Sequence, residues 1–289
     1  MSASRAAAPT RLQKIWRRTW IGGLMVLAMV GLFSACEQTR SPLPLLVVGV
    51  GLSAIGVFEL ARMGTLAGRG LAFPAALALA ASATWVGLDP QRPATLSTAL
   101  TLYGLALVGA LCGSFGRAER EPAASLAQRV AAGLWVGPAM AASALVWSGW
   151  GTPGAVALVV LCKLGDIAGY YIGNAIGKSH PFPSISPGKT TAGCVGSLLA
   201  GCLAGVGLVA LGLLEPLWGG LGAGLIAGAS INLAAQAGDL LESAVKRRAA
   251  VKDSGPWFGP AGGALDLIDS FLLGMPVALF VWPFLFATV

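Results

Sequence analysis

Charged residues are scarce in this sequence. Of its 289 residues only 11% are Asp, Glu, Lys or Arg, whereas 56% are hydrophobic, and the mean hydropathy is +0.77. Soluble domains carry about 25% charged residues, so this chain has too few of them to cover a surface in water. The composition therefore predicts an all-α fold, a polytopic bundle of transmembrane helices.

Two other absences limit the chemistry. Histidine occurs once, as His180 in a proline-rich segment, so Ser-His-Asp hydrolysis has no support. The five cysteines form no Cys-x-x-Cys pair, which argues against a zinc site or a disulfide framework. The P-loop pattern is also absent, because the glycine needed five positions before Gly188 or Gly177 is Pro183 or Ile172.

Apolar runs long enough to cross a bilayer, about 20 residues each, recur along the chain. The runs predict about nine spans, and most of the 19 Lys and Arg residues lie in the N-terminal tail and in every second connection. The other connections hold only Arg40 and Arg92, while Lys163 lies within a span. The positive-inside rule then places the N-terminus in the cytoplasm and the C-terminus outside. The spans are expected near residues 20–36, 43–61, 71–88, 95–115, 128–149, 153–173, 193–214, 217–238 and 265–287.

The net charge of +7 has a membrane explanation. Because the basic residues sit at the ends of apolar runs, they orient helices and attract anionic lipid headgroups, and no nucleic-acid partner is predicted. The N-terminal apolar run has two interpretations. It is a retained first helix, which we favour, or a cleaved lipoprotein signal ending at Ser34-Ala35-Cys36.

Small residues recur at helical spacing within the spans. Gly196, Ala200 and Ala204 form one ladder, and Gly220, Gly224 and Gly228 form another. In lipid, such residues let helices approach closely. These ladders are expected to mark helix contacts.

Charge within the apolar region concentrates in two stretches, 163–193 and 239–269, which both fall on the predicted cytoplasmic side. A charge at membrane depth costs at least ~2.5 kcal/mol, so such residues tend to face polar cavities and to be functional. Glu59, near the inner end of the second span, is instead interpreted as an interfacial partner of Arg62, one turn further on.

The second stretch places several polar groups on one helix face. Asp239, Glu242, Ser243 and Lys246 have the spacing i, i+3, i+4 and i+7. A Gly- and Pro-rich segment, 255–263, follows and cannot be a regular helix.

The last span then opens with Asp266 and Asp269, again on one face. Asp239, Asp266 and Asp269 beside basic residues suit Mg²⁺ and phosphoryl-type transfer, since carboxylates hold the metal and the metal neutralises phosphate oxygens. The alternative is a set of salt bridges that only stabilises the bundle.

The first stretch combines Asp166, Tyr170 and Gly173 with a loop that leads into a helix. The loop ends in Ser186-Pro187-Gly188-Lys189-Thr190. Hydroxyls, glycines and a lysine before a helix can bind phosphate.

At these residues the sequence resembles the phosphatidate cytidylyltransferases, or CDP-diacylglycerol synthases. The family's C-terminal signature is matched without a gap by Ser243-Ala-Val-Lys-Arg247, Lys252-Asp-Ser-Gly255 and 259–270. The residues 166–173 and 186–190 fit its upstream motifs. Two positions depart from the family, because Ala261 stands in place of its His and Leu267 in place of its Arg. These replacements could mean changed substrate contacts, a lower rate or changed chemistry.

The resemblance implies that phosphatidic acid attacks CTP in the membrane, giving CDP-diacylglycerol and pyrophosphate. It implies a catalytic region at 151–289 behind variable helices at 1–150, in the bacterial inner membrane with its site facing the cytoplasm. Whether a second cation such as K⁺ joins Mg²⁺ stays open, as does a homodimer. The implied catalytic residues are Asp239, Lys246, Asp266 and Asp269, of which the three aspartates bind metal. The implied substrate-binding residues are Asp166, Ser186, Lys189, Thr190, Ser243, Arg247, Lys252 and Asp253.

Other functions compete with this one. A CTP-dependent kinase of a polyprenol-type lipid would use the same groups but transfer a phosphoryl group. A non-catalytic homologue would explain the replacements at Ala261 and Leu267. A transporter would need a path of charge through the membrane, whereas the charges here cluster towards one face.

Overall fold

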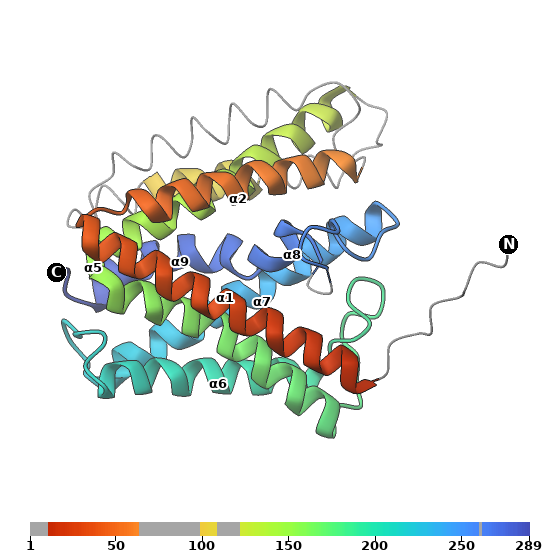
Figure 1. Ribbon diagram of the computed structural model, residues 1–289. Helices are drawn as coiled ribbons and strands as arrows, with labels where there is room; N and C mark the ends of the chain where they lie inside the picture. The colour runs from red at the N-terminus through yellow and green to blue at the C-terminus, as the bar shows by residue number, and fades with distance from the viewer. Residues whose placement is uncertain (1–10, 64–98, 109–121, 260–261) are drawn as a thin grey trace, which may run out of the picture.

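The computed structural model describes residues 11–63, 99–108, 122–259 and 262–289. These residues form helices and no strand, apart from one isolated bridge between Pro216 and Phe286, so the all-α prediction is confirmed. The helices, shown in Figure 1, are α1 (Arg11–Thr39), α2 (Leu43–Arg62), α5 (Pro122–Ile176), α6 (Thr191–Ala210), α7 (Leu221–Arg248), α8 (Ala264–Ile268) and α9 (Phe271–Leu285).

Six helices in the described part of the chain are long and apolar enough to cross a membrane, as expected of an integral membrane protein. The predicted count of about nine spans is not confirmed. The span predicted near 71–88 lies outside the described residues, and of 95–115 the structure describes only a short helix, Ala99–Val108.

The helix α5 covers two of the predicted spans, because its chain reverses direction in the middle (Figure 1). Gly151 has φ 60° and ψ −164°, outside the helical region, and a positive φ is tolerated best by glycine. Pro153 follows, where its missing N–H costs little at the start of a new helical arm. The membrane-length segment Val130–Ile176 has 47 residues, which as one straight helix would extend ~70 Å, over twice the hydrocarbon thickness.

Helices α6 and α7 pack through glycine. A Cβ on Gly224 would meet the carbonyl of Gly205, and one on Gly228 would meet the carbonyl of Gly201. Gly224 and Gly228 of the predicted α7 ladder therefore lie at the contact, whereas Gly220 is the N-cap with open space around it. On α6 the ladder facing α7 is Gly201 and Gly205, not the predicted one, whose Gly196 faces Ile172 of α5.

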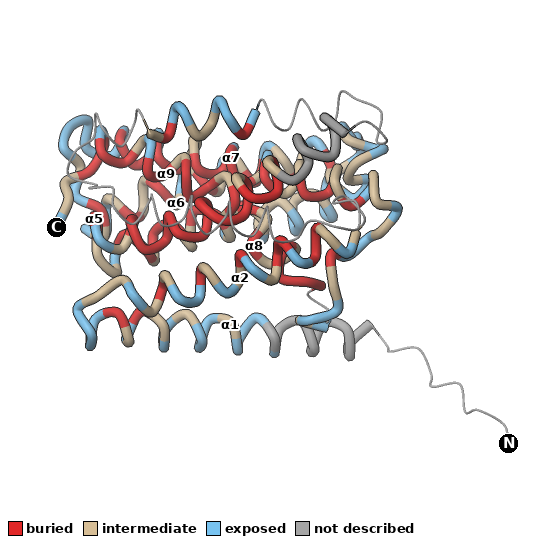
Figure 2. The backbone as a smooth tube through the Cα atoms, turned by 90° about the horizontal axis from the view of Figure 1, so that it is seen from above, coloured by how far each residue is buried: buried red, intermediate tan, exposed pale blue. Residues whose placement is uncertain are grey.

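The core lies between α5, α7 and α9, where Figure 2 shows the buried residues gathered. Trp135 of α5, Ile231 of α7, and Leu272 and Trp282 of α9 are almost fully buried there. The helix α1 lies at the edge of the bundle, and most of its described side chains are exposed or half-buried.

Both polar stretches reach the same end of the bundle. The loop after α5 (177–190) and the loop after α7 (249–263) lie at the right of Figure 1, near the first residues of α1 and the last of α2. The turn after α1, with Arg40, and the C-terminus lie at the other end. The basic residues of the described loops and helix ends thus gather mainly where the two polar stretches meet.

Candidate active site

The loop 177–190 is fixed to α6 by a helix cap. Thr190 has an extended backbone (φ −113°, ψ 153°), and its side chain accepts a hydrogen bond of 3.1 Å from the backbone N–H of Gly193. Gly193 in turn packs on α5, where a Cβ would come within 2.7 Å of the Gly169 carbonyl. Thr190, predicted to bind substrate, therefore starts α6 and holds the loop beside it.

Lys189, next to this cap, points at α7. Its Nζ lies 2.7 Å from Oδ2 of Asp239, and both side chains are partly exposed. A second contact between the stretches is the hydrogen bond of 3.2 Å that Arg247 donates to the Ile185 carbonyl. The two polar stretches, predicted separately from the sequence, form one site.

Three carboxylates converge at its centre. Asp239, Glu242 and Asp269 each place an oxygen within 4.8 Å of the others, and we call them the carboxylate cluster. Glu242 is fully buried; its Oε2 lies 2.5 Å from Nζ of Lys246, while its Oε1 has no hydrogen-bond partner. An oxygen-only donor set with one unpartnered buried oxygen fits Mg²⁺, which prefers carboxylate ligands.

Asp266 points elsewhere. Its Oδ1 lies 2.5 Å from Lys246 Nζ, and its Oδ2 accepts hydrogen bonds of 2.8 Å from the N–H groups of Ser254 and Gly263. The carboxylate thus turns back to cap the first turn of its own short helix, α8. The sequence led us to expect Asp266 beside Asp239 and Asp269, but in the structure Glu242 is the third carboxylate there.

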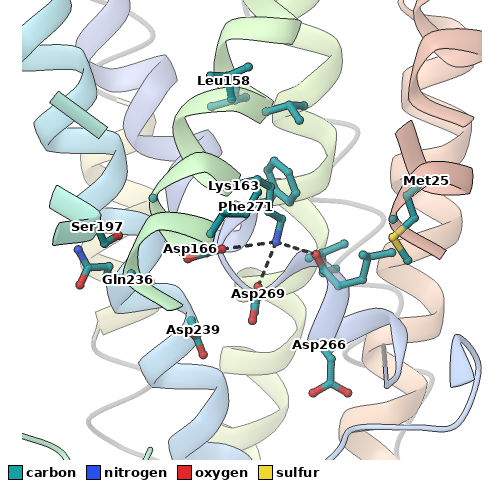
Figure 3. A pocket seen from close by; sticks show the side chains of 18 of the residues that line it. Met25, Leu158, Lys163, Asp166, Ser197, Gln236, Asp239, Asp266, Asp269 and Phe271 are labelled. Carbon is teal, nitrogen blue, oxygen red and sulfur yellow. Dashed lines mark hydrogen bonds and ion pairs between the residues drawn. The ribbon is translucent and has the colours of Figure 1, made fainter. Parts of the chain in front are cut away.

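Lys163, left without a role by the sequence, lies in the middle of the site (Figure 3). Its Nζ is 3.5 Å from Oδ1 of Asp269 and 3.8 Å from Oδ2 of Asp166. It also donates to the Leu267 carbonyl at 3.2 Å and to Ser270 Oγ at 2.7 Å. Its position inside an apolar span was the signal that could have identified it, because buried charges in membranes tend to be functional.

The structure also corrects the interpretation of Glu59. It is 1% exposed, and its carboxylate accepts hydrogen bonds from the backbone N–H groups of Ala264 and Leu265, each 2.9 Å long. The interfacial interpretation with Arg62 is therefore wrong. The true partners lie in the C-terminal part of the chain, so no local spacing could reveal them.

The remaining predicted residues lie beside the centre or in the exposed loop after α7. Ser243 donates to Oδ1 of Asp239 at 3.3 Å, and Ser186 lines the cavity described below. Lys252 and Asp253 are exposed in the loop 249–263. Ala261, one of the two departures from the family pattern, lies outside the described residues.

The site opens into a cavity of about 1730 Å³. Its polar part contains Lys163, Asp166, Lys189, Asp239 and Asp269. Its apolar part is formed by α1, α2 and α5, through Met25, Met29, Phe33, Leu45 and Leu158 among others. The cavity therefore joins a charged end to an apolar wall, an arrangement that suits an amphiphile.

The family model of the cytidylyltransferase family matches residues 16–285, almost the whole chain. The chain belongs to the cytidylyltransferase family. Curated phosphatidate cytidylyltransferases align with this chain over about two fifths of its length. The match to the phosphatidate cytidylyltransferase of Chlamydia muridarum (strain MoPn / Nigg) is 37% identical over 134 residues, 43% of this chain and 41% of that protein.

Two further relatives give similar figures. The phosphatidate cytidylyltransferase of Staphylococcus aureus (strain COL) is 39% identical over 117 residues, 39% of this chain and 43% of that protein. The uncharacterized protein YnbB of Escherichia coli (strain K12) is 38% identical over 120 residues, 42% of this chain and 39% of that protein. The chain thus matches about two fifths of the length of these curated relatives. Its family membership rests on the family model, which covers almost the whole chain.

Proposed function

We propose that this membrane protein transfers the cytidylyl group of CTP to phosphatidic acid, giving CDP-diacylglycerol and pyrophosphate. The observation that carries the proposal is the cavity, which joins four aspartates and two lysines at one end to an apolar wall at the other. The aspartates are Asp166, Asp239, Asp266 and Asp269. Family membership and the names of the two phosphatidate cytidylyltransferases support the same reaction.

The carboxylate cluster is the proposed Mg²⁺ site, held by Asp239 and Asp269 with Glu242 beside them. Bound there, Mg²⁺ would neutralise phosphate oxygens of the nucleotide. Asp266 was expected to be a ligand, but its hydrogen bonds favour a different role, which is to hold Lys246.

Two lysines of the cavity, Lys163 and Lys189, would bind the phosphates. Lys189 and Lys163 flank the cluster from two sides, at 2.7 Å from Asp239 and 3.5 Å from Asp269. Lys246 lies behind it, 2.5 Å from both Glu242 and Asp266. A ring of cations around acidic metal ligands offsets the charge of both a nucleotide and an anionic lipid headgroup.

In the proposed reaction a phosphate oxygen of phosphatidic acid attacks the α-phosphorus of CTP. A new P–O bond forms, the bond between the α-phosphorus and the oxygen bridging to the β-phosphate breaks, and pyrophosphate leaves. The acyl chains would lie along the apolar wall by Met25, Met29 and Phe33, in continuity with the bilayer. The enzyme's main contribution is positioning and charge neutralisation, as in other transfers at phosphorus.

The proposed membrane is the bacterial inner membrane, with the site facing the cytoplasm, where CTP is available. The gathering of basic residues at the end that holds both loops supports this orientation. A membrane-impermeant maleimide should label Ser184→Cys, in a background without other cysteines, only in inside-out vesicles. Labelling in right-side-out vesicles would reverse the orientation.

The reaction is tested with purified protein in mixed micelles of detergent and phosphatidic acid. With CTP labelled at the α-phosphate, the label should enter the lipid fraction only with Mg²⁺ present, with one pyrophosphate released per lipid. With CTP labelled at the γ-phosphate, the lipid should stay unlabelled. Label from the γ-phosphate would instead identify a lipid kinase, and no transfer from either position, with a relative active in parallel, would indicate a non-catalytic homologue.

A further inference from the structure

Glu59 of α2 is buried outside the cavity lining, and a series of polar contacts through Ser254, Asp266 and Lys246 connects it to the carboxylate cluster. It belongs to the N-terminal part of the chain, which the sequence presents as ordinary membrane helices. A buried carboxylate in such a helix is costly unless it is fully hydrogen-bonded. The partners of Glu59 therefore indicate what it is kept for.

The first contacts bind Glu59 to the start of α8. Its Oε1 accepts from the N–H of Ala264 and its Oε2 from the N–H of Leu265, at 2.9 Å each. Both N–H groups belong to the first turn of a helix, where no backbone acceptor is available within the helix. Glu59 thus fixes the place at which the last span begins.

The next contact runs through Ser254. Its Oγ lies 2.8 Å from Oε2 of Glu59 and 2.8 Å from Oδ2 of Asp266, and its single hydroxyl proton can serve either oxygen. Because the backbone N–H of Ser254 also donates to Oδ2 of Asp266, at 2.8 Å, the residue can hold both carboxylates at once. Asp266 holds Lys246 at 2.5 Å, and Lys246 lies 2.5 Å from Glu242 of the carboxylate cluster. The series from α2 to the cluster is complete without a gap.

Glycines of the loop 249–263 make room for these carboxylates. A Cβ on Gly255 would come within 2.5 Å of Oε1 of Glu59, and one on Gly263 would collide with Glu59 and with Ser254 Oγ. Gly262 has φ 86°, and a Cβ there would collide with Asp266. The Gly-rich segment is shaped around Glu59 and Asp266.

We propose that Glu59 is a positioning residue for the reaction, acting through Ser254 and Asp266 to hold Lys246 beside the carboxylate cluster. This inference rests on the proposed cytidylyl transfer. Glu59 itself lies outside the cavity lining and touches no substrate. It would set the rate of the chemical step, while nucleotide affinity would depend on Lys189 and the cluster, whose contacts it does not share.

Glu59→Gln is the test, because the amide keeps the shape but turns an NH₂ group towards at least one donor. In protein that elutes as a folded, monodisperse species, kcat for CDP-lipid formation should fall about tenfold, equivalent to ~1.4 kcal/mol, with the KM for CTP changed less than about twofold. Ser254→Ala should lower kcat in the same direction and covers the case in which Glu59→Gln does not fold. Glu37→Gln, an exposed carboxylate at the opposite end that accepts from Thr152, is the matched control and should leave kcat unchanged.

The outcomes separate the two proposals. An inactive wild type overturns the cytidylyl transfer, and the role of Glu59 with it. An active wild type with unchanged kcat per folded molecule in Glu59→Gln, or in Ser254→Ala if the former is unfolded, overturns the role of Glu59 alone. A fall only in the yield of folded protein would make Glu59 a structural residue.

Discussion

The Lys189 ammonium lies 2.7 Å from the Asp239 carboxylate and so joins the loop before α6 to the polar face of α7. Lys189 can bind an anion such as a phosphate, and Asp239 can bind a cation. A phosphate would draw Lys189 away from Asp239, and a divalent cation would displace Lys189 from it. We therefore expect this ion pair to separate when a magnesium nucleotide binds, which makes it a sensitive point in the site.

Lys189→Met removes the cation from this pair. Charge-assisted hydrogen bonds are worth ~1.5–3 kcal/mol, so kcat/KM for CTP should fall by about 10- to 100-fold. Lys189→Arg should keep part of the activity, because it keeps the charge but not the shape of the ammonium. Lys178→Met, an exposed lysine of the same loop, is the control. Equal kinetics in Lys178→Met and Lys189→Met would refute a phosphate-binding role for Lys189.

Lys163→Met should change metal dependence in the opposite direction to a ligand mutation. Lys163 lies 3.5 Å from Asp269 and repels a cation bound there, so its loss should lower the Mg²⁺ concentration that gives half-maximal activity. At the same time kcat should fall, because one positive charge facing the phosphates is gone. Titration of Mg²⁺ at saturating CTP measures both quantities. A higher Mg²⁺ requirement would mean that Lys163 supports the metal site by another route.

The glycine contact between α6 and α7 can be tested with two neighbouring positions. Gly224→Ala forces a methyl group against the carbonyl of Gly205, and such overpacking typically costs ~1–3 kcal/mol. Gly222→Ala, two residues earlier on α7, meets nothing within 4 Å and should be neutral or stabilising. Thermal unfolding in detergent should therefore give a lower Tm for Gly224→Ala alone. An equal fall in Tm for both variants would show that alanine destabilises helix α7 itself and not its contact with α6.

Much of the site could be predicted from local spacing. Asp239, Ser243 and Lys246 share a helix face by their spacing, and the helix they predict is present as α7. The motif resemblance placed Asp239 and Asp269 in one site, and the structure brings them together. The shared face of Asp239, Ser243 and Lys246 follows from helix geometry alone, whereas the pairing of Asp239 with Asp269 came from the motif resemblance.

The role of Asp266 could not be predicted in this way. On a regular helix it shares a face with Asp269, but it is the third residue of the short helix α8 and turns back to the N–H of Gly263. Glu242 then becomes the third carboxylate of the cluster. A capping interaction of one side chain decided the outcome, and helical spacing does not encode it.

Long-range partners explain the remaining failures. Glu59 bonds to Ser254, 195 residues further along the chain, whereas the sequence offered only the nearby Arg62. The ladder predicted on α6 includes Gly196, which does contact α5 at Ile172, but the contact of Gly201 and Gly205 with α7 was missed, because small residues occupy several faces of that helix and only tertiary packing selects among them.

The meeting of Asp239 and Asp269 at one cation is tested most directly by Mn²⁺ binding, followed through the EPR signal of free Mn²⁺ in titrations of the purified protein. Mn²⁺ accepts the same oxygen ligands as Mg²⁺. We predict one site in the wild type, weakened at least about tenfold in both Asp239→Asn and Asp269→Asn, which is a loss of ~1.4 kcal/mol or more. Glu215→Gln, an exposed carboxylate of the opposite end, should bind as the wild type does. Unchanged Mn²⁺ affinity in either aspartate variant would contradict a shared metal site.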